Sequence, residues 1–209
     1  MNKKVALLLT VLDSKFPNPA TELNYNKDYE LLIAVMLSAQ TTDRRVNSVT
    51  NKLFIRYPTL KDLNRADEKD IKKIIRAIGT YNRKAYYIKE IAQDLIIKYK
   101  GIVPNDKKEL MKLKGIGIKT ANVVTSVLFK EPSIAVDTHV KRVSKRLGLV
   151  LKSDNEFKIE KKLMKIIDKK YWSKVHHQMV LFGRYHCKAK KPECNNCLLK
   201  DICNEKDKN

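Results

Sequence analysis

The chain has 209 residues, and its 44 Lys and Arg outnumber its 23 Asp and Glu, so the formal net charge is +21 at pH 7. This length suffices for one large domain or two small lobes with a real core, and no apolar run is long enough to span a membrane. So large a positive excess typically indicates a polyanionic partner, most often nucleic acid, although a lysine-rich proteome would give the same composition.

The first predicted element is an amphipathic helix at the N-terminus. Residues 1–12 imitate a secretion signal, because lysines precede a short apolar run, but Asp13 and Lys15 follow where a small-residue cleavage site would stand. Apolar residues recur there at the 3.6-residue spacing of a helix, namely Val5, Leu8, Leu9, Leu12 and Phe16. We therefore expect a helix that packs on the body of a cytoplasmic protein.

Short helices are predicted through the centre of the chain. The segment 29–39 is apolar on all faces, which predicts a central buried helix. Apolar stripes at helical spacing follow at 71–78 and 85–95, and Gly79 and Gly101 end them. The expected N-cap residues of later helices are Asn82, Asn105 and Ser153. No segment alternates as a strand does, so the predicted fold class is all-α.

These helices are expected to form two lobes. One comprises residues 23–132, and the other combines residues 1–22 with residues 133–209, so that the chain begins and finishes in the same half. A cleft between two such lobes is where a ligand would bind by default.

A tight glycine turn is predicted between two helices at 105–113 and 118–129. Gly115 and Gly117 stand in this turn and permit positive φ and close backbone approach. The N–H groups at the start of the second helix could then point at one phosphate oxygen. A bare turn between two packed helices would explain the two glycines equally well.

All cysteines of the chain lie near its C-terminus, in the pattern C-x6-C-x2-C-x5-C. They are Cys187, Cys194, Cys197 and Cys203. A disulfide framework does not suit a reducing compartment, so the cluster favours a metal. Four thiolates fit either tetrahedral zinc or an iron–sulfur cluster, and metal chemistry alone leaves both open.

Several segments together resemble the endonuclease III family of DNA glycosylases. They are L-K-G-I-G-I-K-T-A at 113–121, I-A-V-D-T-H-V-K-R-V at 134–143, L-S-A-Q-T-T-D at 37–43 and the C-terminal cysteines, which span nearly the full chain in family order. The resemblance implies a six-helix barrel with a helix-hairpin-helix at about 105–129. It also implies a second helical domain that carries a [4Fe-4S] loop at 187–203, with the active-site cleft between the two.

The resemblance also assigns two catalytic residues. Lys119 matches the family's catalytic lysine, whose amine attacks the sugar C1′, displaces the damaged base and forms a Schiff base that leads to elimination of the 3′ phosphate. Asp137 matches the catalytic aspartate, which accepts a proton or stabilises the positive charge on the sugar. Taken singly, Lys119 could be a solvated surface charge and Asp137 the N-cap of a helix at 138–147; for Asp137 both interpretations can hold.

Three further residues are expected to contact DNA near the extruded nucleotide. Gln40 matches the family glutamine that fills the emptied space and offers donor and acceptor groups to the orphaned base. Thr80, in G-T-Y-N, stands where similar proteins usually carry a bulky apolar wedge, which predicts weaker distortion of the DNA or an altered opposite-base preference. His139 is expected to border the same cleft, although a surface histidine would fit its position equally.

The cysteine spacing is similar to the 4Fe-4S loop of the same family, which favours that cluster over zinc. Between the first two cysteines lies K-A-K-K-P-E, so the metal-held loop would present Lys190 and Lys191, with Lys188, to phosphates. The expected partner is double-stranded DNA that contains a damaged base or an abasic site, and we expect a monomer with no membrane association.

Two alternatives remain open. Within the superfamily, the chain could be an adenine-, mismatch- or dimer-specific glycosylase; the presence of Lys119 favours a pyrimidine-directed enzyme with lyase activity, because adenine glycosylases usually lack that lysine. From another class, it could be a non-catalytic DNA-binding protein that uses its hairpin only to grip phosphate.

Overall fold

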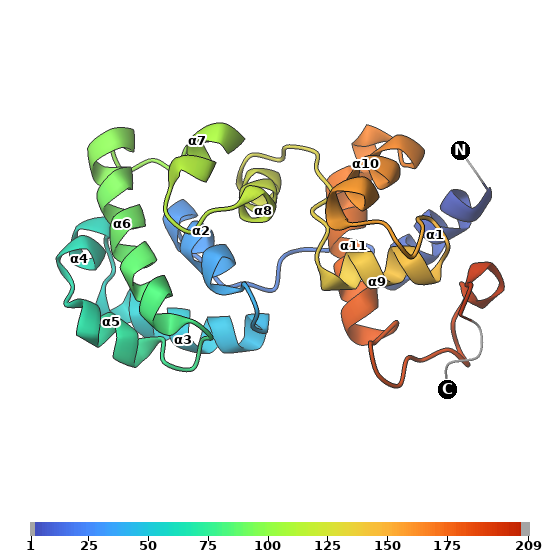
Figure 1. The fold of residues 1–209 in the computed structure, drawn as a ribbon, viewed down its shortest axis with the longest axis horizontal. Coiled ribbons are helices and arrows are strands. Elements are labelled where there is room, and N and C mark those ends of the chain that lie inside the picture. The colour runs from blue at the N-terminus through green and yellow to red at the C-terminus, as the bar shows by residue number, and fades with distance from the viewer. Residues whose placement is uncertain (1–2, 206–209) are drawn as a thin grey trace. The chain divides into compact units, whose positions relative to one another are not determined.

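Helices account for all regular secondary structure in the part of the chain that the computed structural model describes, residues 3–205 (Figure 1). The all-α prediction is confirmed. Within the described residues, no helix is both long enough and apolar enough to cross a membrane.

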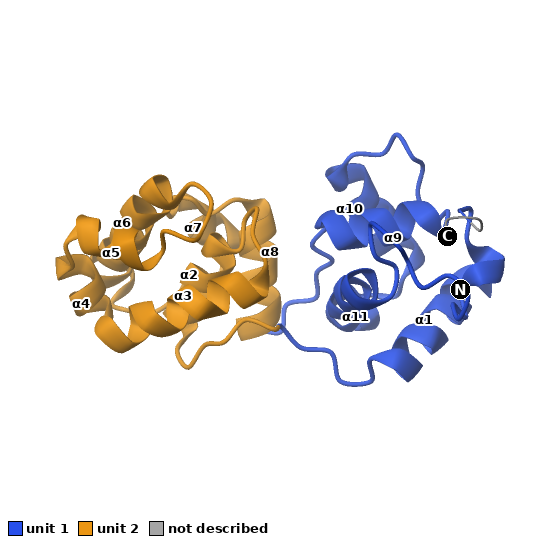
Figure 2. Cartoon of the chain, turned by 90° about the horizontal axis from the view of Figure 1, so that it is seen from below, with its two compact units in different colours: residues 1–21, 130–209 blue, residues 22–129 orange. Residues whose placement is uncertain are grey.

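The chain divides into two compact units (Figure 2). Unit 2 comprises residues 22–129, and unit 1 combines residues 1–21 with residues 130–209. The boundary after residue 129 follows the end of a helix at Leu128, so residues 130–132, which the sequence-based division gave to the first lobe, lie in unit 1.

Unit 2 contains seven of the described helices. They are α2 (Asp28–Leu37), α3 (Asp43–Arg56), α4 (Leu60–Arg65), α5 (Glu68–Ile74), α6 (Tyr81–Tyr99), α7 (Lys107–Lys112) and α8 (Ile118–Leu128). Helix α2 is the predicted central helix, because every residue from Tyr29 to Leu37 is buried. It packs against α3, α6 and α8. Each fully buried Leu or Ile of this core contributes about 1.5–3 kcal/mol relative to exposure, which makes α2 the element on which the unit is assembled.

Unit 1 is built around two packed helices from the C-terminal half of the chain, α9 (Thr138–Arg146) and α11 (Trp172–Tyr185). Its other elements are α1 (Lys3–Lys15), α10 (Glu156–Ile166), η1 (Lys169–Tyr171) and η2 (Lys200–Ile202). Helix α11 packs on both α9 and α1. The amphipathic first helix is confirmed, since its buried face carries Val5, Leu8 and Leu12. The Gln178 amide on α11 donates to the Asp13 carboxylate and to the Phe16 carbonyl, which ties the end of α1 in place.

The N-caps predicted at Asn82, Asn105 and Ser153 are wrong. Helix α7 is capped by Asp106, and helix α10 by Asn155; both side chains accept backbone N–H groups of the first turn. Helix α6 starts one residue before Asn82, with Thr80 as the N-cap residue and no side-chain cap. At the starts of α7 and α10, residues that can cap stand next to one another, so the backbone conformation imposed by packing decides which one does.

Candidate functional site

The glycine turn between α7 and α8 uses its two glycines differently. Gly115 has φ +77°, and a Cβ there would lie 2.3 Å from a ring carbon of Tyr87, so both backbone and space require glycine. Gly117 has φ −96° and nothing within 4 Å of an added Cβ. The prediction of positive φ therefore holds for Gly115 alone, whereas Gly117 leaves open space at the start of α8. Between them, the buried Ile116 anchors the turn in the core of unit 2.

Lys119 is the second residue of α8 and is exposed. Gly117, at the N-cap, makes no side-chain cap, and the first turn carries no acidic residue. The N–H groups at this helix start thus lack a side-chain partner at the cap, and no carboxylate in the first turn of α8 offsets the positive end of the helix dipole. The arrangement presents an amine beside a surface that favours anions.

Asp137 is the N-cap of α9, as the helix-start interpretation predicted. Its carboxylate Oδ1 accepts the Val140 N–H at 2.7 Å, and the side chain is half-buried. The preceding residues 134–136 are buried in the core of unit 1, which fixes the backbone on which the carboxylate stands. A carboxylate at a helix N-terminus is favoured in its ionised form. Lys119 and Asp137 belong to different units, so their shared cleft stays a prediction.

Gln40 and Thr80 both stand in exposed turns of unit 2 with left-handed backbone. Gln40 has φ +62° and follows the end of α2, where the Thr41 N–H closes the turn onto the Ser38 carbonyl at 3.1 Å. Thr80 has φ +56° directly before α6, and its hydroxyl donates to the Gly79 carbonyl at 2.6 Å. Non-glycine residues adopt this conformation only where the surroundings impose it, which marks both turns as constrained sites.

His139 packs inside unit 1 at the crossing of α9 and α11. A Cβ on Gly183 would lie 2.8 Å from the His139 Cβ, so the two helices approach closely at this point. The His139 Nδ1 lies 3.1 Å from the Arg142 guanidinium. Burial lowers the pKa of His139, with the nearby Arg142 acting in the same direction and Asp137 against them. The residue is half-buried, and its expected contact with DNA stays a prediction.

The four C-terminal cysteines all line one pocket of about 30 Å³ in unit 1. Arg146 lies against two of them: its Nη1 donates to the Cys187 sulfur at 3.3 Å, and the Cys203 thiol donates to its carbonyl at 3.4 Å. Burial raises the pKa of the Cys187 thiol, and the Arg146 hydrogen bond counteracts it. Among the described residues, no group of three or more His, Cys, Asp or Glu side chains is arranged to hold a metal ion.

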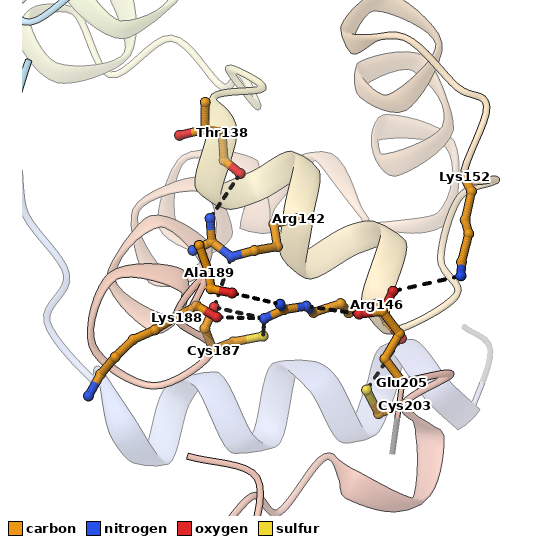
Figure 3. Close-up of polar contacts among 9 residues, drawn as sticks. All are labelled: Thr138, Arg142, Arg146, Lys152, Cys187, Lys188, Ala189, Cys203 and Glu205. Carbon is orange, nitrogen blue, oxygen red and sulfur yellow. Dashed lines mark hydrogen bonds and ion pairs between the residues drawn. The ribbon is translucent and has the colours of Figure 1, made fainter. Parts of the chain in front are cut away.

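Two arginines on one face of α9 tie the cysteine loop to the rest of unit 1 (Figure 3). The buried Arg146 donates to the Lys188 carbonyl at 2.7 Å and pairs with Glu205 at 3.1 Å. Arg142 donates to the Cys187 carbonyl at 3.0 Å and to the Gly183 carbonyl at 2.7 Å. Neither arginine was predicted as a functional residue, although their i, i+4 spacing on a predicted helix indicates that both side chains share one face.

The lysines of the loop do not share one environment. Lys190 and Lys191 are exposed, as expected for phosphate contacts. Lys188 instead forms an ion pair with Glu193 at 2.7 Å, so Glu193 partly neutralises its charge within the loop.

Comparisons with known proteins agree across the whole chain. Residues 33–169 match the family of HhH-GPD superfamily base excision DNA repair proteins. Endonuclease III of Bacillus subtilis is 45% identical over 206 residues, which cover 99% of this chain and 94% of that protein. Endonuclease III of Escherichia coli is 42% identical and matches 100% of this chain and 99% of its own length.

Solved structures extend the agreement to the fold. The structure of a trapped endonuclease III–DNA covalent intermediate has a TM-score of 0.93 and 50% identity, over 99% of this chain and 98% of that one. A thermostable thymine-DNA glycosylase, at 23% identity and a TM-score of 0.84, shows the fold alone. The chain therefore belongs to the endonuclease III family, within the HhH-GPD superfamily of base excision DNA repair proteins.

Proposed function

We propose that this protein is a DNA N-glycosylase and abasic-site lyase that excises oxidised or ring-saturated pyrimidines from double-stranded DNA. The single observation that supports this most is Lys119, an exposed amine on the first turn of α8 beside a helix start that favours phosphate. A related endonuclease III has been trapped as a covalent intermediate with DNA, as an attacking amine requires. We further propose that it acts in the cytoplasm as a monomer.

The proposed reaction begins with the neutral amine of Lys119. It attacks C1′ of the damaged nucleoside, the C1′–N bond breaks, and the base leaves with a proton. Opening of the sugar ring then gives a Schiff base. Loss of a C2′ proton breaks the C3′–O bond and nicks the strand 3′ to the abasic site, and water releases the lysine. Asp137, whose side chain accepts the Val140 N–H at the start of α9, stabilises the positive charge that develops on the sugar and accepts a proton.

The remaining site residues are proposed to hold and open the duplex. The turn of Gly115 and Gly117 brings backbone N–H groups to a phosphate, and the open space at Gly117 allows that approach. Gln40 enters the space that the extruded nucleotide leaves, and Thr80 is the second, smaller wedge. His139 borders the pocket of the extruded base, and Lys190 and Lys191 contact phosphates outside it.

The four cysteines are proposed to hold a 4Fe-4S cluster. Their side chains line one pocket, which Arg146 supplies with a buried positive charge that suits thiolate ligands. In such a cluster each thiolate binds a different iron, so the four sulfurs need not converge on one point. When bound, the cluster would hold the loop 187–203 rigid, and ordered lysines lose less entropy on contact with DNA.

Borohydride trapping on a duplex with one oxidised pyrimidine tests the nucleophile and separates the enzyme from a non-catalytic phosphate-gripping protein. The native chain is expected to form a covalent adduct, and Lys119→Ala to form none, because no other amine is expected to reach C1′. Lys114→Ala, which removes another exposed lysine of the same turn, is the matched control and should still be trapped at saturating DNA. Equal trapping of the native chain and Lys119→Ala would overturn the assignment.

A further inference from the structure

The two turns proposed to open the duplex are both held in a conformation that their residues do not prefer. Gln40 and Thr80 have φ of +62° and +56°, and both side chains are exposed. Exposed turns of this kind relax unless other contacts hold them. Something within unit 2 must therefore fix each turn, and the two must be fixed together if both enter one duplex.

Lys84 contacts both turns. Its ammonium group donates to the Leu37 carbonyl at 2.9 Å and to the Ala39 carbonyl at 2.7 Å, on the chain that leads directly into Gln40. Its own backbone N–H donates to the Thr80 carbonyl at 3.1 Å, which forms the first turn of α6. One residue on α6 thus closes the turn before its own helix and the turn after α2.

The environment of this lysine explains why it stays in place. Lys84 is only 5% exposed, and burial lowers its pKa, so its charge depends on the acceptors around it. Leu37 and Ala39 lie at the C-terminal end of α2, where helix carbonyls lack partners and the negative end of the helix dipole favours a cation. A buried ammonium group between two carbonyls is more rigid than a surface lysine, because its release would leave polar groups unpaired.

We propose that Lys84 is a positioning residue that holds the Gln40 turn and the Thr80 turn at a fixed spacing, so that both act on the same opened base pair. The inference rests on the proposed function, since it takes Gln40 and Thr80 as the residues that enter the duplex. Lys84 itself does not touch the DNA and takes no part in bond breaking.

The variant Lys84→Met tests this role, because it keeps the length of the side chain and removes both hydrogen bonds to the Gln40 turn. Two single-turnover rates are measured: excision of an oxidised pyrimidine paired in a duplex, and nicking of the same duplex with a preformed abasic site. Excision requires a base pair to be opened, whereas the abasic site has no base to withdraw. We expect excision to fall about tenfold or more, as misplaced contacts typically cause, and nicking to change by less than about twofold.

Helix α6 offers a matched control. Lys89, five residues further along α6, donates to the Ala66 carbonyl at 2.7 Å, and Ala66 belongs to neither turn. Lys89→Met loses a comparable bond and should leave the ratio of the two rates unchanged. Lys84→Arg, which retains a cationic donor, should restore part of the excision rate. Should Lys84→Met fail to fold by circular dichroism, Lys84→Gln replaces it and should lower the same ratio to a smaller extent.

The outcomes separate two failures. If the native chain neither excises the base nor nicks the abasic site, the proposed function is wrong. If the native chain does both, and Lys84→Met lowers both rates equally or neither of them, the positioning role is wrong while the function stands. A lowered ratio of excision to nicking in Lys89→Met would also overturn the positioning role of Lys84, because the effect would then come from a general weakening of α6.

Discussion

The two glycines of the turn between α7 and α8 are required for different reasons. Gly115 is required by its own conformation and by the ring of Tyr87, both within unit 2. Gly117 meets no such requirement inside the protein. What remains for Gly117 is the open space beside the start of α8, which suits a ligand that approaches the backbone.

Exchanging each glycine for alanine should give opposite results. Gly115→Ala should lower the free energy of unfolding by about 1–3 kcal/mol, because alanine is strained at φ +77° and its methyl group would displace Tyr87. Gly117→Ala should leave stability nearly unchanged and weaken binding to an abasic duplex, because a methyl group would stand where a phosphate approaches. Denaturant unfolding and DNA titration of both variants check this. A stable Gly115→Ala, or unaltered binding by Gly117→Ala, would contradict the respective part.

The cysteine loop at 187–203 is held by contacts from helix α9 in unit 1. Arg142 and Arg146 of α9 donate to the carbonyls of Cys187 and Lys188, so the loop is held by hydrogen bonds as well as by any metal (Figure 3). The N-cap of the same helix is Asp137, so the helix that contacts the loop also carries the proposed catalytic carboxylate at its start.

Metal analysis of the purified protein should find about four irons and acid-labile sulfide per chain. Removing the metal should destabilise unit 1 selectively. The pocket would then contain four thiols that have lost their bonds to iron, beside the buried charge of Arg146. Far-UV circular dichroism with hydrogen exchange would locate the loss. Zinc without sulfide would show that the cysteines hold a single ion instead.

The exposed pair Lys190 and Lys191 should contribute to DNA binding without regard to sequence. Replacing both by alanine should lower the slope of log K against log salt concentration by about 1 per lost phosphate contact. The pair Lys161→Ala and Lys165→Ala, on exposed positions of α10, changes the net charge equally and is the control. An equal decrease in both double variants would assign the effect to net charge and not to the loop.

At the scale of the whole molecule, charge and burial act in different ways. The net charge of +21 attracts DNA over long distances and selects no site. Stability depends instead on two separate cores, one in each unit. In unit 1 the buried residues include a histidine, His176 on α11.

His176 should make the protein sensitive to acid. Burial, together with the neighbouring His177, lowers its pKa from 6.5 to about 3, so the folded state stays neutral while the unfolded state binds a proton below pH 6.5. Above pH 6.5 this histidine does not reduce the free energy of unfolding. As the pH falls from 6.5 toward 3, it lowers the free energy of unfolding by up to about 1.4 kcal/mol per pH unit. Unfolding measured from pH 7 to pH 4 should show a shallower decline in His176→Gln. Identical pH dependence in the two proteins would contradict this.

The sequence by itself determined the features that depend on local pattern. Helical periodicity predicted the all-α class and the buried helix α2, and a carboxylate directly before a helical stretch predicted the cap at Asp137, because neighbours in the chain decide these properties. Motif resemblance supplied the family, which the comparisons confirm over the full length.

Tertiary structure alone decided what depends on residues far apart in the chain. Lys84 reads as one more surface lysine of a basic sequence, yet it binds carbonyls 47 and 45 residues away. Arg146 likewise meets the sulfur of Cys187, 41 residues along the chain. Packing of whole helices creates these contacts. Where α2 packs against α6, and α9 against α11, water is excluded, so each charged group must find its hydrogen-bond partners within the protein.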